Sequence, residues 1–435
     1  MTPEAPAAAM PPRPYQGYVD ELSTTHVAGW LRSLSDPAER VEYEVMLPRT
    51  GEIVLRGTAS KLLPGLRKIG IGDGRYGFYA RLPRPLAEDE PAEVQVRVSC
   101  NGQLLEPSAW LVSEYQPVHH LVMDIVDNCN LRCPFCLYDY ATTHTTHVMS
   151  EATIDAAVRF APYATDGNFW FSCLHEPTLH PRLMEFVQKV PFKYRRKLFF
   201  TTNLAKRMPD RYFEFLADSG MHHINVSIES LDPALYERMR KGARHHIFQE
   251  NWDKLLPALA RGSAPPKLRY ISMAYKSNLR QLPSLADYLL GDRGGAQIEI
   301  RHTYDEPHLP DDFRRAEFLQ RDEWLWLRDE LARFPPDKVQ LSLPPGIDDP
   351  GFDRNMFPER PAASARQTPP PPLPPEEIPG CLPGRYGMRL SWDGTLEISR
   401  VWGSDDEPIP TDLRVAIMNV REISDVDTFF AELPA

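Results

Sequence analysis

The chain has 435 residues and a formal net charge of −11, and 42% of its residues are hydrophobic. A single core rarely grows beyond roughly 250–300 residues, so this length predicts two or three domains. The acidic balance argues against nucleic acid or anionic lipid as a partner. No apolar run approaches the ~18 residues that span a bilayer, and no signal-like segment opens the chain, so we expect a cytoplasmic protein with no membrane partner.

The N-terminal region alternates apolar and polar residues in short runs. We expect residues 1–14 to be disordered. The runs VEYEVMLP, EIVLRGTA, YGFYARLP and AEVQVRVS then follow, separated by Gly, Pro and Asp turns. This alternation is typical of half-buried antiparallel strands, and it predicts a β-sandwich accessory domain over residues 15–116. The segments GYVD, HVAGWLRS and GIGDGRYGFYARLP resemble a small β domain that is appended to bacterial glycosyltransferases and related glycan-modifying enzymes.

The middle of the chain has a different sequence pattern, in which compact strand-like runs alternate with helical stretches. The runs are HLVMDIVD, NFWFSC, KLFFTTN, HINVSIES, LRYISMAY and IEIRHTYD. Strands that alternate with helices pair in parallel through right-handed crossovers. We therefore predict an α/β fold with a partial (β/α)6 parallel barrel over residues 117–310. In such barrels the chemistry lies at the carboxyl ends of the strands.

Residues 311–435 are predicted to form a C-terminal extension. A helix (RDEWLWLRDELARF) and a strand (VQLSLPP) lead into a Pro-rich stretch at 345–380, which we expect to be an extended linker. The last segment predicts a small β-hairpin, GCLPGRYGMRLSWDGTLEISRVW. Asp393 and Gly394 would supply the two positive φ angles of a type I′ turn.

Three of the six cysteines stand within eight residues, at Cys129, Cys133 and Cys136. This C-x3-C-x2-C spacing is one thiolate short of the four that close an ordinary zinc or iron–sulfur site. A four-iron cluster held by three cysteines leaves one iron open to a further ligand. The alternative is a zinc knuckle that takes its fourth ligand from His144 or His147.

With Phe135 as the aromatic residue, C-x3-C-x-Φ-C resembles the cluster motif of the radical S-adenosylmethionine (SAM) superfamily. The resemblance covers roughly residues 117–310 and implies one 4Fe–4S cluster, with SAM chelating the fourth iron and yielding a 5′-deoxyadenosyl radical when cleaved. It also implies an electron donor such as flavodoxin or ferredoxin as a partner. The protein would supply positioning and a dry cavity.

The resemblance also assigns residues to the SAM side of the site. In FSCLHEPTLHP, Glu176 and Pro177 match the last two residues of the family's Gly-Gly-Glu-Pro segment, so Glu176 is expected to accept hydrogen bonds from the SAM ammonium group. TTN stands where the family has Thr-Asn-Gly, with Leu204 in place of the glycine. The further cofactor-binding candidates are Phe135, Asn203, Ser227 and Glu229. Arg240 could reach the SAM carboxylate, although we favour a solvated helix position for it.

The extension resembles the first motif of relatives that bind extra clusters through further cysteines, the SPASM and twitch type, but here only Cys381 remains. The sequence thus lacks a second cysteine set that could take up the substrate radical's electron. A redox-neutral reaction is therefore expected. Cys173 and Cys381 are candidate hydrogen-atom donors, and His175 is a candidate proton carrier; inert packing is the alternative for both cysteines.

The sequence therefore predicts a radical SAM enzyme that abstracts hydrogen from a polar, small-molecule or glycan-like substrate, with epimerisation, dehydration or rearrangement as the outcome. The glycan assignment follows only from the resemblance of the N-terminal region. A peptide-modifying maturase of the SPASM type is the main alternative. A non-catalytic iron–sulfur protein is the alternative from another class.

Overall fold

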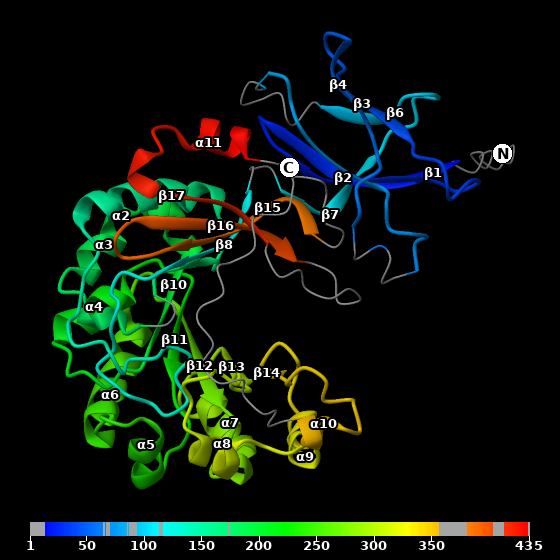
Figure 1. The fold of residues 1–435 in the computed structure, drawn as a ribbon. Coiled ribbons are helices and arrows are strands. Elements are labelled where there is room, and N and C mark those ends of the chain that lie inside the picture. Colours follow the sequence, from blue (N-terminus) through cyan, green and yellow to red (C-terminus); the bar gives the residue numbers. More distant parts are fainter. Residues whose placement is uncertain are drawn as a thin grey trace, which may run out of the picture.

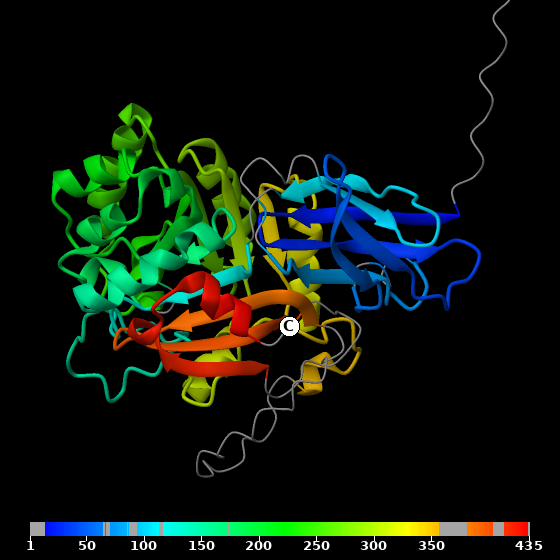
Figure 2. The same cartoon turned by 90° about the horizontal axis from the view of Figure 1, so that it is seen from above.

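The computed structural model describes residues 14–63, 66, 70–84, 86, 94–112, 116–172, 175–355, 381–402 and 413–433, and all structural statements below refer to these residues. The predicted N-terminal disorder and Cys173 lie outside them. Figures 1 and 2 show an N-terminal β unit beside a larger α/β unit, and the two remain side by side in both views.

The N-terminal unit contains two sheets. The first has the strand order β5-β2-β1-β7 and the second the order β4-β3-β6. Their bounds are β1 (Tyr15–Leu22), β2 (His26–Ser33), β3 (Glu42–Leu47), β4 (Glu52–Thr58), β5 (Gly77–Arg81), β6 (Gln95–Val98) and β7 (Glu106–Val112). The pairing is antiparallel except between β1 and β7, which run parallel. The runs that alternate in sequence are therefore the strands of this unit.

Alternation in these strands places one set of side chains in a shared core. Val27 and Leu31 of β2, Val45 of β3 and Val98 of β6 are almost completely buried, and they belong to one hydrophobic cluster. Since these residues come from both sheets, the two sheets enclose a common core that is separate from the core of the α/β unit.

The α/β unit is built on a ten-stranded sheet of order β14-β13-β12-β11-β10-β9-β8-β15-β16-β17. The strands expected from the sequence are β8 (Val118–Met123), β9 (Phe169–Trp170), β10 (Leu198–Thr202), β11 (His223–Ser227), β12 (Lys267–Met273) and β13 (Gln297–Arg301). They pair in parallel with their neighbours, as predicted. The sequence placed β14 (Val339–Ser342) after the barrel, but it continues the same parallel sheet beside β13.

Helices α2 to α9 lie in the crossovers between the parallel strands, whereas α10 follows the edge strand β14 and α11 follows the last strand, β17. Their bounds are α2 (Glu151–Ala157), α3 (Leu183–Lys189), α4 (Asp210–Ala217), α5 (Pro233–Met239), α6 (His245–Arg261), α7 (Leu282–Gly291), α8 (Asp311–Glu317), α9 (Arg321–Leu331), α10 (Phe352–Asn355) and α11 (Val426–Glu432). Short 3-10 helices lie at Val158–Tyr163, Pro177–Leu179, Phe192–Lys197, Leu279–Gln281 and Val420–Glu422. Figure 1 shows α2, α3, α4 and α6 along the outer side of the sheet. No helix among the described residues combines the length and the hydropathy needed to cross a bilayer.

The C-terminal extension adds β15 (Cys381–Leu390), β16 (Thr395–Trp402) and β17 (Arg414–Asn419) to the sheet, because β15 pairs in parallel with β8. The predicted hairpin is present between β15 and β16, but the type I′ turn is wrong. Leu390 pairs with Leu396, and only Gly394 has a positive φ, of 97°. Ser391 N also donates to the carbonyl oxygen of Thr395 at 2.9 Å, so the loop has three residues instead of two, and Asp393 avoids the left-handed conformation.

The expected extended linker at 345–380 is also wrong in its first part. Residues 345–355 contain turns and the short helix α10. Asp349 accepts a hydrogen bond from the backbone N–H of Gly351, which closes a local turn that the proline content did not indicate. The rest of the predicted linker, 356–380, lies outside the described residues.

Candidate active site

A cavity of about 220 Å³ lies at the carboxyl ends of the parallel strands, and we call it the cluster pocket. The residues that the sequence singled out come together here: the lining includes Cys129, Cys133, Phe135, Cys136, His175, Glu176, Asn203, Ser227 and Glu229. The parallel arrangement explains this convergence, because each side chain follows a different strand and all carboxyl ends share one edge. Cys173 is outside the described residues. Cys381 begins β15, and its side chain is not described.

The three cysteines lie in the loop that follows β8, and all three thiols are free. Backbone N–H groups point at two of the sulfurs: Leu131 donates to Cys129 Sγ at 3.4 Å and Tyr138 donates to Cys136 Sγ at 3.4 Å. His308, from the segment after β13, contacts the Cys136 carbonyl oxygen through Nε2 at 2.8 Å and so fixes the end of the loop.

Burial raises the pKa of all three thiols, and it raises the pKa of Cys129 to about 12, with the nearby charge of Glu176 acting in the same direction. Thiols in such surroundings keep their protons until a cation displaces them. The N–H donors would then stabilise the resulting thiolates.

The donor set fits a cluster held by three cysteines. Among the described residues no three His, Cys, Asp or Glu side chains converge as ligands of a single metal ion. In a four-iron cluster, by contrast, each cysteine takes a different iron. His147 lies elsewhere: its Nδ1 is 2.5 Å from Asp127 Oδ2 and its ring stacks on Trp392, while His144 is exposed.

Glu176 is a buried hub on the wall of the pocket, with 2% of its surface exposed. Its Oε1 accepts hydrogen bonds from Thr178 N, Thr178 Oγ1 and Thr202 Oγ1, at 3.2, 2.7 and 2.8 Å. Its Oε2 accepts one, from the backbone N–H of Asn203 at 2.8 Å. A carboxylate offers about four lone-pair sites, two on each oxygen, so Oε2 keeps capacity for one further donor.

Burial raises the pKa of Glu176, and the hydrogen bonds from Asn203, Thr178 and Thr202 lower it in part. The charged form thus depends on its donors, and an ammonium group in the pocket would favour it further.

Asn203 connects the turn after β10 to the cysteine loop. Its Nδ2 donates to Asn130 Oδ1 at 2.9 Å and lies 3.5 Å from Cys129 Sγ. Leu204 follows with a φ of 53°, the only positive φ of a non-glycine residue among those described. Leu204 therefore adopts the left-handed backbone at a cost in strain, at the position where the resemblance expects a glycine.

A residue that sequence reasoning missed, Asn251 of α6, holds this strained turn. Its Nδ2 donates to the carbonyl oxygens of Leu204 at 2.8 Å and Lys206 at 2.7 Å, and its Oδ1 accepts from Met208 N at 3.2 Å. Asn251 is 1% exposed. Nothing in the local sequence indicated this contact, because α6 approaches the turn only in the folded chain.

Glu229 and Arg240 form a buried ion pair. Arg240 Nε and Nη2 donate to the two carboxylate oxygens of Glu229 at 2.5 and 2.8 Å, and the exposed fractions are 6% for Arg240 and 0% for Glu229. The expected solvated position of Arg240 is therefore wrong, since this side chain lines the cluster pocket. Burial lowers the pKa of Arg240, but the charges of Glu229, Cys133 and Tyr236 together raise it above its ordinary value, so Arg240 stays protonated.

His175 is 7% exposed and packs against two tyrosines. Its Nδ1 lies 2.8 Å from Tyr140 Oη, and its ring makes an edge contact with Tyr138. Burial lowers the pKa of His175, although the charges of Asp124 and Asp127 oppose this. The neutral imidazole is thus the favoured form. The tyrosine partner was not expected from the sequence.

The fold and these contacts define a class: an α/β protein with a three-thiol pocket at the carboxyl edge of a parallel sheet. Residues 123–259 match the Radical SAM superfamily. This part of the chain is therefore similar to the radical SAM superfamily, whose members use a 4Fe–4S cluster and SAM.

Curated relatives and solved structures are similar to this chain over part of its length. GTP 3',8-cyclase of Microcystis aeruginosa is 26% identical over 165 residues, which are 35% of this chain and 47% of the relative. Probable GTP 3',8-cyclase of Methanococcus maripaludis is 25% identical over 166 residues, 38% of this chain and 53% of the relative. The chain thus spans about half the length of the curated relatives it matches. Streptococcus suis SuiB bound to S-adenosylmethionine has a TM-score of 0.46 at 13% identity, covering 73% of this chain and 66% of SuiB.

Proposed function

We propose that this chain is a radical SAM enzyme that abstracts a hydrogen atom from an organic substrate. The observation that carries the proposal is the meeting of three free thiols with Glu176, Asn203 and Ser227 in one pocket. When bound, the cluster and SAM supply a 5′-deoxyadenosyl radical, which is the hydrogen-abstracting species of this superfamily. The protein positions these groups and shapes the cavity around them.

Each lining residue has a proposed part in that positioning. Cys129, Cys133 and Cys136 hold three irons, and Phe135 packs beside them against Tyr275 at a ring-centroid distance of 5.2 Å. Glu176 Oε2 accepts from the SAM ammonium group. We further propose that Asn203, Ser227, Glu229 and Arg240 line the remainder of the SAM site, with the Glu229–Arg240 pair supplying a fixed dipole at its wall.

We propose a redox-neutral outcome on the ground of cysteine count. The six cysteines of the sequence include the cluster set and no second set to accept the substrate radical's electron. Cys173 and Cys381 remain candidate hydrogen-atom donors and His175 a candidate proton carrier. A low-potential protein such as a flavodoxin or ferredoxin is the proposed electron donor.

The observations restrict the substrate class less than they restrict the cofactors. A glycan-like substrate rests on the resemblance of the N-terminal region alone, and a peptide remains the alternative. The curated relatives are named for GTP, but the charges of the cluster pocket disfavour a nucleoside triphosphate here. A triphosphate needs free cationic side chains, and both arginines that line this pocket are paired with glutamates. Arg240 pairs with Glu229, and Arg301 pairs with Glu299 at 2.6 Å.

The domain assignment is also part of the proposal. Residues 15–116 would form a β-sandwich accessory domain, residues 117–310 the partial barrel, and residues 311–435 an extension related to SPASM and twitch domains. The separate hydrophobic core of the N-terminal unit and the parallel strand order support this division.

Anaerobic reconstitution tests the proposed function. We expect about four irons per chain, a SAM-dependent release of 5′-deoxyadenosine, and loss of the iron absorbance in Cys129→Ala, Cys133→Ala and Cys136→Ala. Cys100→Ala is the matched control, because Cys100 is a free, exposed cysteine in the N-terminal unit. One zinc per chain without iron, or about eight irons, would contradict the single three-cysteine cluster.

A further inference from the structure

A second cavity, of about 330 Å³, lies next to the cluster pocket. It is formed at the carboxyl ends of β12, β13 and β14, and the segment before α9, α9 itself and α10 close it. His302 and Tyr304 line both cavities, so the two are neighbours on the same edge of the sheet. Ligand sites in proteins occupy roughly 300–1,000 Å³, so this cavity suits a small group rather than a large one.

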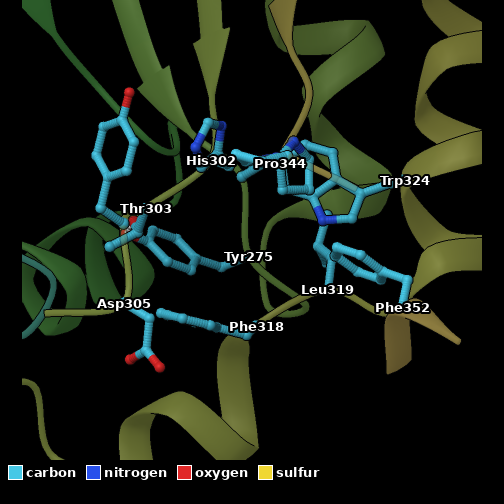
Figure 3. A pocket seen from close by; sticks show the side chains of 12 residues that line it. Tyr275, His302, Thr303, Asp305, Phe318, Leu319, Trp324, Pro344 and Phe352 are labelled. Atoms are coloured by element: carbon cyan, nitrogen blue, oxygen red, sulfur yellow. Dashed lines mark hydrogen bonds between the residues drawn. The ribbon is translucent and has the colours of Figure 1, made fainter. Parts of the chain in front are cut away.

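The lining is mainly aromatic and apolar. Figure 3 shows Tyr275 and Phe318 between His302 on one side and Asp305 on the other, with Trp324, Leu319 and Phe352 on a further side. The wall residues are Ala274, Tyr275, Phe318, Leu319, Trp324, Pro344, Pro345 and Phe352. Tyr275 uses its hydroxyl on Thr303 and is completely buried, so it contributes apolar ring carbons and no free polar end to the wall. Flat apolar walls of this kind favour a ring.

One polar atom in this wall has no partner. His302 Nδ1 lies 3.1 Å from the carbonyl oxygen of Ser342, and a carbonyl can only accept, so Nδ1 carries the proton of that bond. In the neutral ring, Nε2 is then an acceptor. It is buried and has no hydrogen-bond partner within the described structure. A buried polar atom without a partner is costly to keep, which calls for an explanation such as a ligand.

The charged side chain of the wall, Asp305, already has a counter-ion. Asp305 forms an ion pair with Arg314, which is itself buried and also pairs with Asp311 at 2.8 Å. The cavity therefore offers flat apolar walls and one buried acceptor. A carbohydrate, which needs several polar partners, matches this lining poorly.

We propose that this cavity, the aromatic pocket, binds an aromatic ring that carries an O–H or N–H donor, a phenol or an indole, with the donor bonded to His302 Nε2. Binding of the ring does not depend on the proposed function. The inference that this ring is part of the substrate does rest on it. Its place beside the cluster pocket would bring the ring, or the carbon chain attached to it, to the edge of the SAM site.

Binding is measured on the full chain by calorimetry or ligand-observed NMR, with 4-methylphenol and 3-methylindole as probes and 4-methylanisole as the matched ligand without a donor. We expect both donor probes to bind, and 4-methylanisole to bind about two- to tenfold more weakly than 4-methylphenol, which is the range for one hydrogen bond. Equal affinity for phenol and ether, or no binding of either, would overturn the proposal. This comparison needs no variant.

Variants then assign the acceptor. His302→Phe should abolish the preference for the phenol over the ether, and His302→Gln, whose amide oxygen can accept, should restore part of it. His246→Phe is the control, since His246 is exposed on α6 and lines neither cavity. A preference that persists in His302→Phe with a native unfolding midpoint would contradict the role of Nε2.

A further binding experiment tests whether the aromatic ring belongs to a peptide or to a free small molecule. Binding of N-acetyl-tyrosinamide as tight as that of 4-methylphenol would assign an aromatic residue of a peptide, and loss of binding would assign a free small molecule; both support an aromatic ligand. SAM binding is measured in parallel. Probe binding without SAM binding would leave the aromatic pocket standing and refute the proposed function, whereas SAM cleavage without probe binding would do the reverse.

Discussion

Glu176 combines two tasks in one side chain, because three of its hydrogen bonds end on Oε1 and only one on Oε2. The first oxygen ties together the segments after β9 and β10, which sets the shape of the pocket. The second retains acceptor capacity toward the cavity. Replacing the carboxylate should therefore affect the proposed SAM site both by removing the charge and by disturbing the wall.

Glu176→Gln is expected to weaken SAM binding by about ten- to a hundredfold, since a hydrogen bond to a charged group contributes roughly 1.5–3 kcal/mol. The cluster should remain, because Glu176 is not a thiol ligand. Equilibrium binding of SAM to the reconstituted protein measures the effect. Glu185→Gln on the exposed face of α3 is the matched control. An unchanged dissociation constant would show that the SAM ammonium group lies elsewhere.

The pH dependence of SAM binding follows from the raised pKa of Glu176. In the proposed contact the ionised carboxylate accepts from the SAM ammonium group, so affinity should fall as the pH falls through the pKa of Glu176. Because burial raises that pKa, the loss should begin at a higher pH than for a solvated glutamate, whose ordinary value is 4.5. Glu176→Gln should flatten this acid limb. A limb that is identical in the variant would assign it to another group.

At the scale of elements, α6 holds the backbone of the turn after β10, which we propose faces SAM. Leu204 sits in a left-handed conformation that costs roughly 1–2 kcal/mol, and Asn251 holds its carbonyl oxygen from α6. Asn251 does not line the cluster pocket itself. Any effect of Asn251 on the proposed SAM site must therefore be one of positioning, through the main chain of residues 203–208.

Asn251→Ala should weaken SAM binding several-fold and leave the iron content unchanged, because the turn loses the contacts that hold Asn203 against the cysteine loop. A double variant, Asn251→Ala with Leu204→Gly, should regain part of the lost affinity, since glycine adopts the positive φ without strain. Gln249→Ala on the exposed side of α6 is the control. Loss of stability without any change in SAM affinity would reduce Asn251 to a purely structural role.

The hairpin of the extension is coupled to the cluster loop, because β15 pairs with β8 and the cysteine loop follows β8. Gly394 has a φ of 97°, and a Cβ there would lie 3.1 Å from Asn419 Oδ1. Gly394→Ala should therefore destabilise the chain by about 1–2 kcal/mol in urea unfolding. Gly291→Ala is the control: Gly291 ends α7, a Cβ there meets nothing within 4 Å, and the change should be neutral or stabilising. Equal effects of the two substitutions would refute this account.

The sequence predicted those parts of the site that depend on local patterns. The cysteine spacing identified three residues of one loop. The resemblance of the segments at the strand ends assigned Glu176, Asn203, Ser227 and Glu229, and all of these residues line the cluster pocket. The sequence did not predict the contacts that join separate elements. The end of α5 suggested a solvated Arg240, because its partner Glu229 lies across the loop that connects β11 to that helix.

The same limit explains the partners that were missed. Asn251, His302 and His308 become significant only when α6 and the segment after β13 approach the pocket. In the same way, β14 was recognised as a strand, but its place in the parallel sheet depends on packing beside β13. Residues of this kind carry no signature in short windows of sequence.

At the scale of the whole molecule, the N-terminal unit contacts the extension through a buried ion pair. Arg385 of β15 donates to Glu21 Oε2 at 2.6 Å and to the carbonyl oxygen of Gln116. Glu21 is 1% exposed, and burial raises its pKa although Arg385 lowers it. This contact lies on the extension and not on the cluster pocket, while each unit has a hydrophobic core of its own.

Removal of residues 1–115 should therefore leave SAM affinity and iron content within about twofold of the full chain, because no residue of the N-terminal unit lines the cluster pocket as described. The shortened chain should unfold at a lower temperature, since Arg385 then loses Glu21 and stays half-buried without a carboxylate. Arg385→Gln in the shortened chain should recover part of this loss, whereas in the full chain it should destabilise by leaving Glu21 buried and unpaired.

The N-terminal unit, expressed as residues 14–112, should fold cooperatively around its own core. A soluble shortened chain that no longer binds SAM would instead make the N-terminal unit part of the catalytic unit.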